Sequence, residues 1–160
     1  MAKVISWDSC VFLSWFKQEL DKPLADIEEY LKMISNEDIR LLVSVVCAVE
    51  VLDQDTGSYG TQFQEFMKRN NVTALNVDMR VAKQAAIFRQ NGAEALENGV
   101  IKKGFKAPDA MIVASAYVYQ AEVLHTFDPV LLDLSGTPYV NGLRIAKPLL
   151  ESGTQKTFLT

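Results

Sequence analysis

The stretch Val4-Ile5-Ser6-Trp7-Asp8-Ser9 combines a short, mostly apolar run with an abrupt polar end. An apolar run of this length, bounded by polar residues, is typical of a buried β-strand. Asp8 and Ser9 are residues of the kind that cap the first turn of a helix, so a helix is expected directly after the strand. The stretch therefore predicts a strand and a helix, with an acidic residue at the junction between them.

The same alternation of strand and helix continues along the chain. Further strands are predicted at residues 40–43, 72–77, 122–126 and 143–146. Apolar spacing and capping residues predict helices around residues 13–20, 24–34, 44–52, 63–67, 81–88 and 108–119. Asn91-Gly92 is expected to end the helix that begins near Val81. Because strands that alternate with helices are joined by crossovers, the pattern predicts an α/β fold with a mainly parallel sheet covered on both faces.

Length and composition restrict the class of protein. The chain has 160 residues, close to the size of one ordinary domain, and 49% of them are hydrophobic. We expect one domain over residues 1–150, followed by a frayed C-terminal tail over residues 151–160. The net charge of −4 excludes a strongly basic protein that coats nucleic acid.

The chain carries none of the sequence signals of export or membrane insertion. Its longest nearly apolar run, residues 41–52, is shorter than a membrane span and contains Ser44 and Glu50. Met1-Ala2-Lys3 leads directly into the first predicted strand, so a signal peptide is not expected. Cys10 and Cys47 form no CxxC pair and lie in apolar contexts, so they are expected to be buried free thiols. A cytoplasmic protein with no membrane partner is predicted.

Four acidic residues fall where ligands bind in parallel sheets, beyond the carboxyl ends of the strands. Asp8 ends the first predicted strand, and Asp128 follows the predicted strand at residues 122–126. Asp109 lies in the first turn of a predicted helix, where the helix dipole favours a negative charge. Glu50 lies in an otherwise apolar helix, where a carboxylate is costly unless it is paired or binds a metal. Each residue alone has an ordinary structural explanation, but together they converge on one end of the sheet.

Such a cluster points to a hard divalent cation. Neighbouring carboxylates repel one another, which raises some of their pKa values, and a bound cation removes that repulsion. Oxygen ligands suit Mg²⁺ or Mn²⁺, whereas zinc prefers thiolate and imidazole. With one histidine and two unpaired cysteines in the chain, a zinc site is not expected.

At four places the sequence resembles the motifs of the PIN-domain nucleases, in that family's order over residues 4–146. Val4-Ile5-Ser6-Trp7-Asp8-Ser9 resembles the opening motif, and Val46-Cys47-Ala48-Val49-Glu50-Val51-Leu52 resembles the second, a helix that carries one glutamate. Pro108-Asp109-Ala110 resembles the Pro-Asp-Ala start of a helix, and Thr126-Phe127-Asp128 resembles the final Thr-x-Asp motif.

The resemblance implies a three-layer α/β/α sandwich and an Mg²⁺- or Mn²⁺-dependent endoribonuclease whose products carry 5′-phosphate and 3′-hydroxyl ends. Asp8, Glu50, Asp109 and Asp128 would be both the catalytic and the metal-binding residues, with Asp8 and Asp109 as direct ligands. Ser9 and Thr126 would orient those ligands. The resemblance also implies the toxin of a toxin–antitoxin pair, with a protein antitoxin as partner. A homodimer is expected from the family's habit and from the apolar first two helices.

Attraction of RNA to an acidic protein requires local positive charge. Lys102, Lys103 and Lys106 directly precede Asp109 and are the candidate RNA-binding residues. A second basic group, formed by Arg80, Lys83 and Arg89, lies on one predicted helix. Both groups also fit ordinary solvated surfaces.

The sequence departs from the family pattern at Cys10, Phe127 and Pro129, which affects expected substrate contacts more than metal binding. The alternative to a nuclease is a catalytically silent PIN-like module that binds RNA or serves in assembly. Retention of all four acidic residues argues against that alternative, because RNA binding alone gains nothing from carboxylates that repel phosphate. Metal titration distinguishes the two.

Overall fold

Five parallel strands form the centre of the structure, a computed structural model that describes residues 2–54 and 57–151. The strands lie in the order β3-β2-β1-β4-β5, and every neighbouring pair is parallel. Their bounds are β1 (Lys3–Trp7), β2 (Ile39–Ser44), β3 (Val72–Leu75), β4 (Val123–His125) and β5 (Ile145–Ala146). All carboxyl ends of the strands therefore meet at one edge of the sheet.

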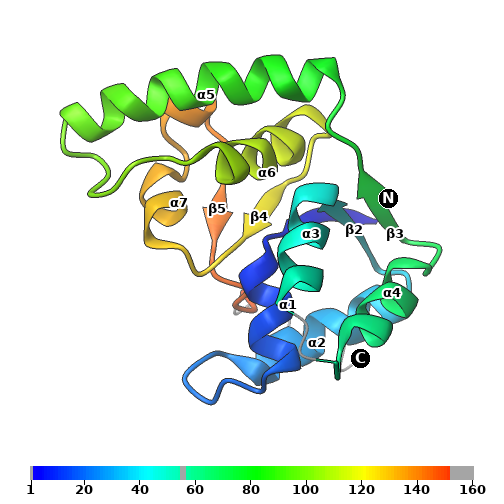
Figure 1. Ribbon diagram of the computed structural model, residues 1–160. Helices are drawn as coiled ribbons and strands as arrows, with labels where there is room; N and C mark the ends of the chain where they lie inside the picture. The colour runs from blue at the N-terminus through cyan, green and yellow to red at the C-terminus, as the bar shows by residue number, and fades with distance from the viewer. Residues whose placement is uncertain (1, 55–56, 152–160) are drawn as a thin grey trace.

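Helices cover both faces of this sheet, as Figure 1 shows. Helices α5 and α6 lie on one side, and α1, α2 and α4 lie on the other. The helices are α1 (Ser9–Phe16), α2 (Leu24–Ser35), α3 (Val45–Asp53), α4 (Gly60–Met67), α5 (Met79–Glu97), α6 (Ala107–Val118) and α7 (Pro129–Leu134), with a 3₁₀ turn at Pro138–Val140. This arrangement confirms the predicted three-layer α/β/α sandwich.

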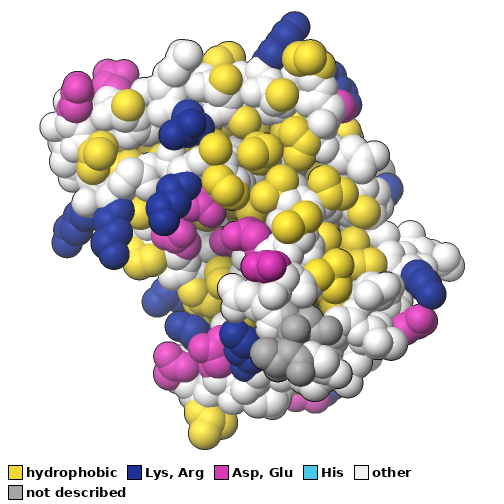
Figure 2. Space-filling view, viewed as in Figure 1, with side chains coloured by type: hydrophobic (Ala, Val, Ile, Leu, Met, Phe, Trp, Pro, Cys, Tyr) yellow, Lys and Arg dark blue, Asp and Glu magenta, His cyan; other side chains and the backbone are white. Residues whose placement is uncertain are grey.

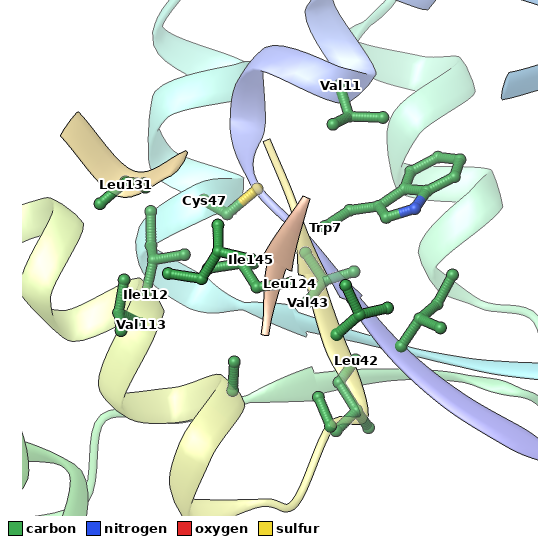
Figure 3. Packing of buried hydrophobic residues seen from close by; sticks show 14 of the residues in the cluster. Trp7, Val11, Leu42, Val43, Cys47, Ile112, Val113, Leu124, Leu131 and Ile145 are labelled. Carbon is green, nitrogen blue, oxygen red and sulfur yellow. The ribbon is translucent and has the colours of Figure 1, made fainter. Parts of the chain in front are cut away.

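The core is continuous across the sheet because its strands are buried on both faces (Figure 3). In β1, Ile5 and Trp7 are buried, and the Trp7 ring packs edge-on against Phe12 of α1. Helix α6 buries Ile112 and Val113 together with the small residues around them, as its nearly all-apolar sequence predicts. Among the described residues, no helix is both long and apolar enough to span a membrane.

Several predicted boundaries differ from the structure. Strand β3 ends at Leu75 rather than at residue 77, and α7 was not predicted because its six residues are too few to show a period. The predicted tail at residues 151–160 lies outside the described residues, except for Glu151, whose carboxylate accepts a hydrogen bond from Arg144.

The expectation that Asn91-Gly92 ends a helix is wrong, since α5 continues to Glu97. Gly92 is buried inside the helix, and a Cβ atom at this position would lie 2.8 Å from Cβ and Cδ1 of Phe105. The glycine is therefore required by the close approach of a side chain from another segment. Phe105 lies two residues before the start of α6, so this contact positions the segment that carries Lys102, Lys103 and Lys106.

Substitution Gly92→Ala should lower stability although alanine favours helix by about 1 kcal/mol. Overpacking against the Phe105 ring outweighs that gain, so we expect the free energy of unfolding to fall by roughly 1–2 kcal/mol in urea titrations. Gly104→Ala is the matched control, because nothing lies within 4 Å of a Cβ atom there. Equal or higher stability of Gly92→Ala would contradict the proposed role of this contact.

Candidate functional site

The sheet has one point at which consecutive connections leave in opposite directions. From β1 the chain proceeds outward through β2 and β3, and it then returns to place β4 on the other side of β1. Ligands of open parallel sheets bind at such a switch point, beyond the carboxyl ends of the two strands. Asp8 directly follows β1, and Asp128 follows β4 by three residues.

Asp8 is held from both of its oxygen atoms. Its Oδ1 accepts a hydrogen bond from the Ser9 backbone N–H at 2.7 Å, as the cap of α1. Its Oδ2 accepts from the Thr126 hydroxyl at 2.8 Å and lies 3.6 Å from the Cys10 thiol. With only 5% of its surface exposed, Asp8 is a buried carboxylate bonded to the first residue after β4.

Ser9 connects Asp8 to Glu50. The Ser9 hydroxyl donates to Glu50 Oε1 at 3.3 Å and lies 3.4 Å from Asp8 Oδ1, so two carboxylates compete for one proton. Glu50 reaches this position because Ser44, at the end of β2, caps α3 by accepting from the Val46 N–H. The half-buried Glu50 lies in the second turn of that helix.

The other two acidic residues approach from the opposite side. Asp109 is half-buried in the first turn of α6, a helix with proline in its first turn. Asp128 caps α7 by accepting from the Val130 N–H at 2.8 Å, and its own N–H donates to the Thr126 hydroxyl. Thr126 therefore links Asp8 to the backbone of Asp128.

Because these carboxylates lie near one another, their charges raise the pKa values of Asp109, Glu50 and Asp8. Burial, and then the charges of Asp8, Asp128 and Glu50, raise the pKa of Asp109 to about 7, against a small lowering by Lys106. Burial and the charge of Asp8 raise the pKa of Glu50. Burial also raises the pKa of Asp8 despite its hydrogen bonds. Among the ion pairs of the described residues, none includes any of the four carboxylates.

The donor set fits a hard divalent cation in chemistry. It consists of carboxylate and hydroxyl oxygen atoms, and the ion pairs of the described residues leave these carboxylates out. In residues 2–54 and 57–151, however, no three His, Cys, Asp or Glu side chains form a group that could hold a metal ion. In the conformation described, hydrogen bonds within the protein occupy Asp8 and Asp128. The assignment of metal ligands stays a prediction.

The predicted RNA-binding lysines lie beside this cluster. Lys102, Lys103 and Lys106 line a cavity of about 410 Å³ together with Asp109 and Asp128. In Figure 2, acidic side chains gather near the middle of the visible face, with basic side chains to one side. The structure thus brings the three lysines to the acidic cluster, whereas Arg80 forms an ion pair with Asp78 on the surface.

Cys10 was expected to be a buried thiol, but it is half-buried and belongs to this network. Its sulfur accepts from the Phe127 N–H at 3.3 Å and lies 3.4 Å from the Thr126 hydroxyl. Burial and the charge of Asp8 raise its pKa to about 12, so the thiol is neutral. The sequence feature that could have placed Cys10 at the site is its position two residues after Asp8, in the first turn of α1. Cys47 is buried, as expected.

His125, at the end of β4, has a structural role. Its Nδ1 accepts from Trp7 Nε1 at 3.1 Å, and its ring packs edge-on against Tyr30. Burial lowers the pKa of His125 to about 3, so the imidazole is neutral. Trp7 and Phe12 are core residues, and Trp15 and Phe16 pack partly buried against the core.

No protein-family model and no curated protein matches the sequence, but solved structures match its fold. A chain of a toxin–antitoxin complex from Klebsiella pneumoniae is 17% identical with a TM-score of 0.60, covering 92% of this chain and 99% of that one. A chain of FitAcB from Neisseria gonorrhoeae is 20% identical with a TM-score of 0.56, covering 90% and 97%. A chain of DNA-bound VapBC from Salmonella typhimurium is 18% identical with a TM-score of 0.59, covering 92% and 99%.

These similarities extend over nearly the full length of both chains, so they concern the whole domain rather than a shared fragment. At this level of identity they establish the fold. The chain therefore has the fold of proteins found in toxin–antitoxin complexes, which confirms the α/β architecture that the resemblance to PIN-domain nucleases implies.

Proposed function

We propose that this protein is a metal-dependent endoribonuclease that hydrolyses RNA phosphodiester bonds. The observation that carries the proposal is the convergence of Asp8, Glu50, Asp109 and Asp128 at the switch point of the sheet. Each of the other three carboxylates raises the pKa of Asp109, and no ion pair within the described residues offsets their charge. A binding module alone gains nothing from this arrangement.

In this proposal, Asp8, Glu50, Asp109 and Asp128 hold Mg²⁺ or Mn²⁺. A cation held there would lower the pKa of a bound water and would stabilise negative charge on the phosphodiester and its leaving oxygen. Ser9 and Thr126 fix the carboxylates through the hydrogen bonds to Glu50 and Asp8. Lys102, Lys103 and Lys106 attract the phosphates of RNA toward the acidic cluster.

We further propose that the enzyme is the toxin of a toxin–antitoxin pair and acts in the cytoplasm. The solved chains that share its fold come from toxin–antitoxin complexes, which supports a protein antitoxin as partner. Free cysteines suit a reducing compartment.

Cleavage of labelled RNA tests the activity directly. Purified protein should cleave RNA in Mg²⁺ or Mn²⁺ and not in EDTA, and Asp109→Asn should reduce the rate by about 100-fold or more because it removes a proposed metal ligand. Lys68→Gln, at the opposite edge of the sheet, is the control and should retain the wild-type rate. Activity that persists in EDTA would reject the metal-dependent mechanism. Mn²⁺ calorimetry that gives equal affinity for wild type and Asp109→Asn would favour the catalytically silent module.

The pH dependence of stability tests the electrostatic cluster independently of activity. The pKa of Asp109 lies above that of an unfolded aspartate, so the folded protein binds the proton more tightly and loses stability as pH rises from about 4 to 7. In chelator, Asp109→Asn should match wild type near pH 4.5 and melt about 2–4 °C higher at pH 8, after allowance for solvent screening of a half-exposed group.

Added Mn²⁺ should reverse that order at pH 8 by stabilising wild type alone. A lower melting temperature of Asp109→Asn in chelator would show instead that this carboxylate supports the fold.

We also infer a homodimer, with a different surface from the one that the sequence favoured. The apolar side chains of α1 lie in the core, whereas Val49 of α3, Ile87 of α5 and Tyr117 of α6 are 65%, 48% and 37% exposed. Figure 2 shows hydrophobic side chains gathered over these three helices. An apolar surface of this kind marks an interface.

Ile87→Glu should therefore convert a dimer into a monomer in light scattering after size-exclusion chromatography, because it places a charge in the interface. Leu20→Glu is the matched control, since Leu20 is 93% exposed on the connection between α1 and α2. A monomeric wild-type protein would exclude this dimer.

A further inference from the structure

A second cavity, of about 440 Å³, opens on the α1 side of the acidic cluster. Asp8 and Asp128 line it together with Lys17, Lys22 and Phe127, so we refer to it as the Lys–Phe cavity. Asp128 also lines the cavity of Lys102, Lys103 and Lys106. The acidic cluster consequently has a lysine-bearing cavity on each of two sides, and both cavities adjoin it through the same aspartate.

Lys22 and Phe127 form a defined pair inside the Lys–Phe cavity. The Lys22 ammonium lies 4.9 Å from the centre of the Phe127 ring, and 28% of the Lys22 side chain is exposed. Lys22 also lies 3.6 Å from the exposed carboxylate of Asp21, and the Lys17 ammonium donates to Gln54 at 3.1 Å. Glu19 is a further acidic residue of the lining. Surface contacts of these kinds are weak, so both ammonium groups can exchange them for a phosphate.

Phe127 is fixed relative to the acidic cluster. Its backbone N–H donates to the Cys10 sulfur, and its neighbours in sequence are Thr126, which is bonded to Asp8, and Asp128. The ring is half-buried and lines the cavity, and it stands where the Thr-x-Asp pattern requires no aromatic residue. The position of the ring is thus set by the same hydrogen bonds that hold the carboxylates.

We propose that the Lys–Phe cavity binds one nucleotide of a single-stranded RNA, with Lys17 and Lys22 on the phosphate and the Phe127 ring stacked on the base. Aromatic rings beside cationic groups are the usual means of holding single strands, and only an unpaired base offers a free face for stacking. The strand continues past Asp128 into the cavity of Lys102, Lys103 and Lys106. This inference rests on the proposed ribonuclease function and assigns to it a nucleotide-binding subsite formed by Lys17, Lys22 and Phe127.

Binding in EDTA, where the proposed enzyme does not cleave, tests the subsite. Fluorescently labelled oligo-adenylate and oligo-uridylate are titrated with wild type, Lys22→Gln, Phe127→Leu, Phe127→Tyr and Lys68→Gln, with each variant first checked for wild-type melting behaviour. Lys68→Gln is the matched control because Lys68, like Lys22, is near one carboxylate, and it lies just before β3 at the opposite edge of the sheet.

Lys22→Gln should weaken binding of both oligonucleotides and reduce the slope of log affinity against log salt by about 0.7, the value for one phosphate contact. Phe127→Leu should weaken binding about tenfold, more for adenylate than for uridylate, without changing the slope. Phe127→Tyr should restore wild-type affinity because it keeps the ring, and Lys68→Gln should bind as wild type does.

The failures of the subsite and of the proposed function are distinguishable. If wild type binds RNA and both Lys22→Gln and Phe127→Leu bind like Lys68→Gln, the subsite is wrong and the ribonuclease proposal stands. If Phe127→Tyr binds as weakly as Phe127→Leu, the stacking role is wrong. If wild type binds neither oligonucleotide at any salt concentration, the subsite is rejected, and cleavage of RNA in Mg²⁺ or Mn²⁺ decides the RNA substrate separately.

Discussion

Electrostatic repulsion among Asp8, Glu50, Asp109 and Asp128 opposes the packing that brings these carboxylates together at the end of the sheet. Parallel strands end at one edge, so the loops after β1 and β4 and the helices that start there bring acidic residues from distant parts of the sequence together. Left in contact, such groups favour separation or protonation. They remain together because the elements that carry them are anchored in the core, where Ile5, Leu124 and Ile112 are buried.

Small side chains that form hydrogen bonds connect the carboxylates to several elements of the fold. The Thr126 hydroxyl donates to Asp8 and accepts from the Asp128 backbone, while Ser9 joins α1 to Glu50 of α3. Cys10 adds a third connection, from α1 to the backbone of Phe127. These contacts link β1, α3 and the loop after β4, so one hydrogen-bonded network holds Asp8, Glu50 and Asp128. Hydroxyl and thiol groups suit this role since they bring hydrogen bonds without adding charge.

The strands and the acidic residues that follow them were predictable because burial leaves a local trace in the sequence. An apolar run that stops at aspartate, such as the one before Asp8, identifies both the strand and its end. Features that need a partner from elsewhere leave no such trace. From sequence alone, Gly92 indicates the end of a helix, whereas the structure shows that it makes room for Phe105. Likewise, Cys10 resembles a core thiol in the sequence, whereas in the structure it lies beside the Thr126 hydroxyl. The pairing of Lys22 with Phe127 depends on two loops that are over 100 residues apart.

The lysines beside the acidic cluster carry a further implication. Lys102, Lys103 and Lys106 line a cavity with Asp109 and Asp128, yet none of them forms an ion pair with either carboxylate in the described part of the chain. Closer pairing would require the exposed ammonium groups to lose water, and the attraction gained would be small because solvent screens it. Positive and negative charges therefore stay adjacent without forming ion pairs. A ligand that brings a cation and a phosphate together satisfies both sets at once, which neither a cation nor an anion alone can do.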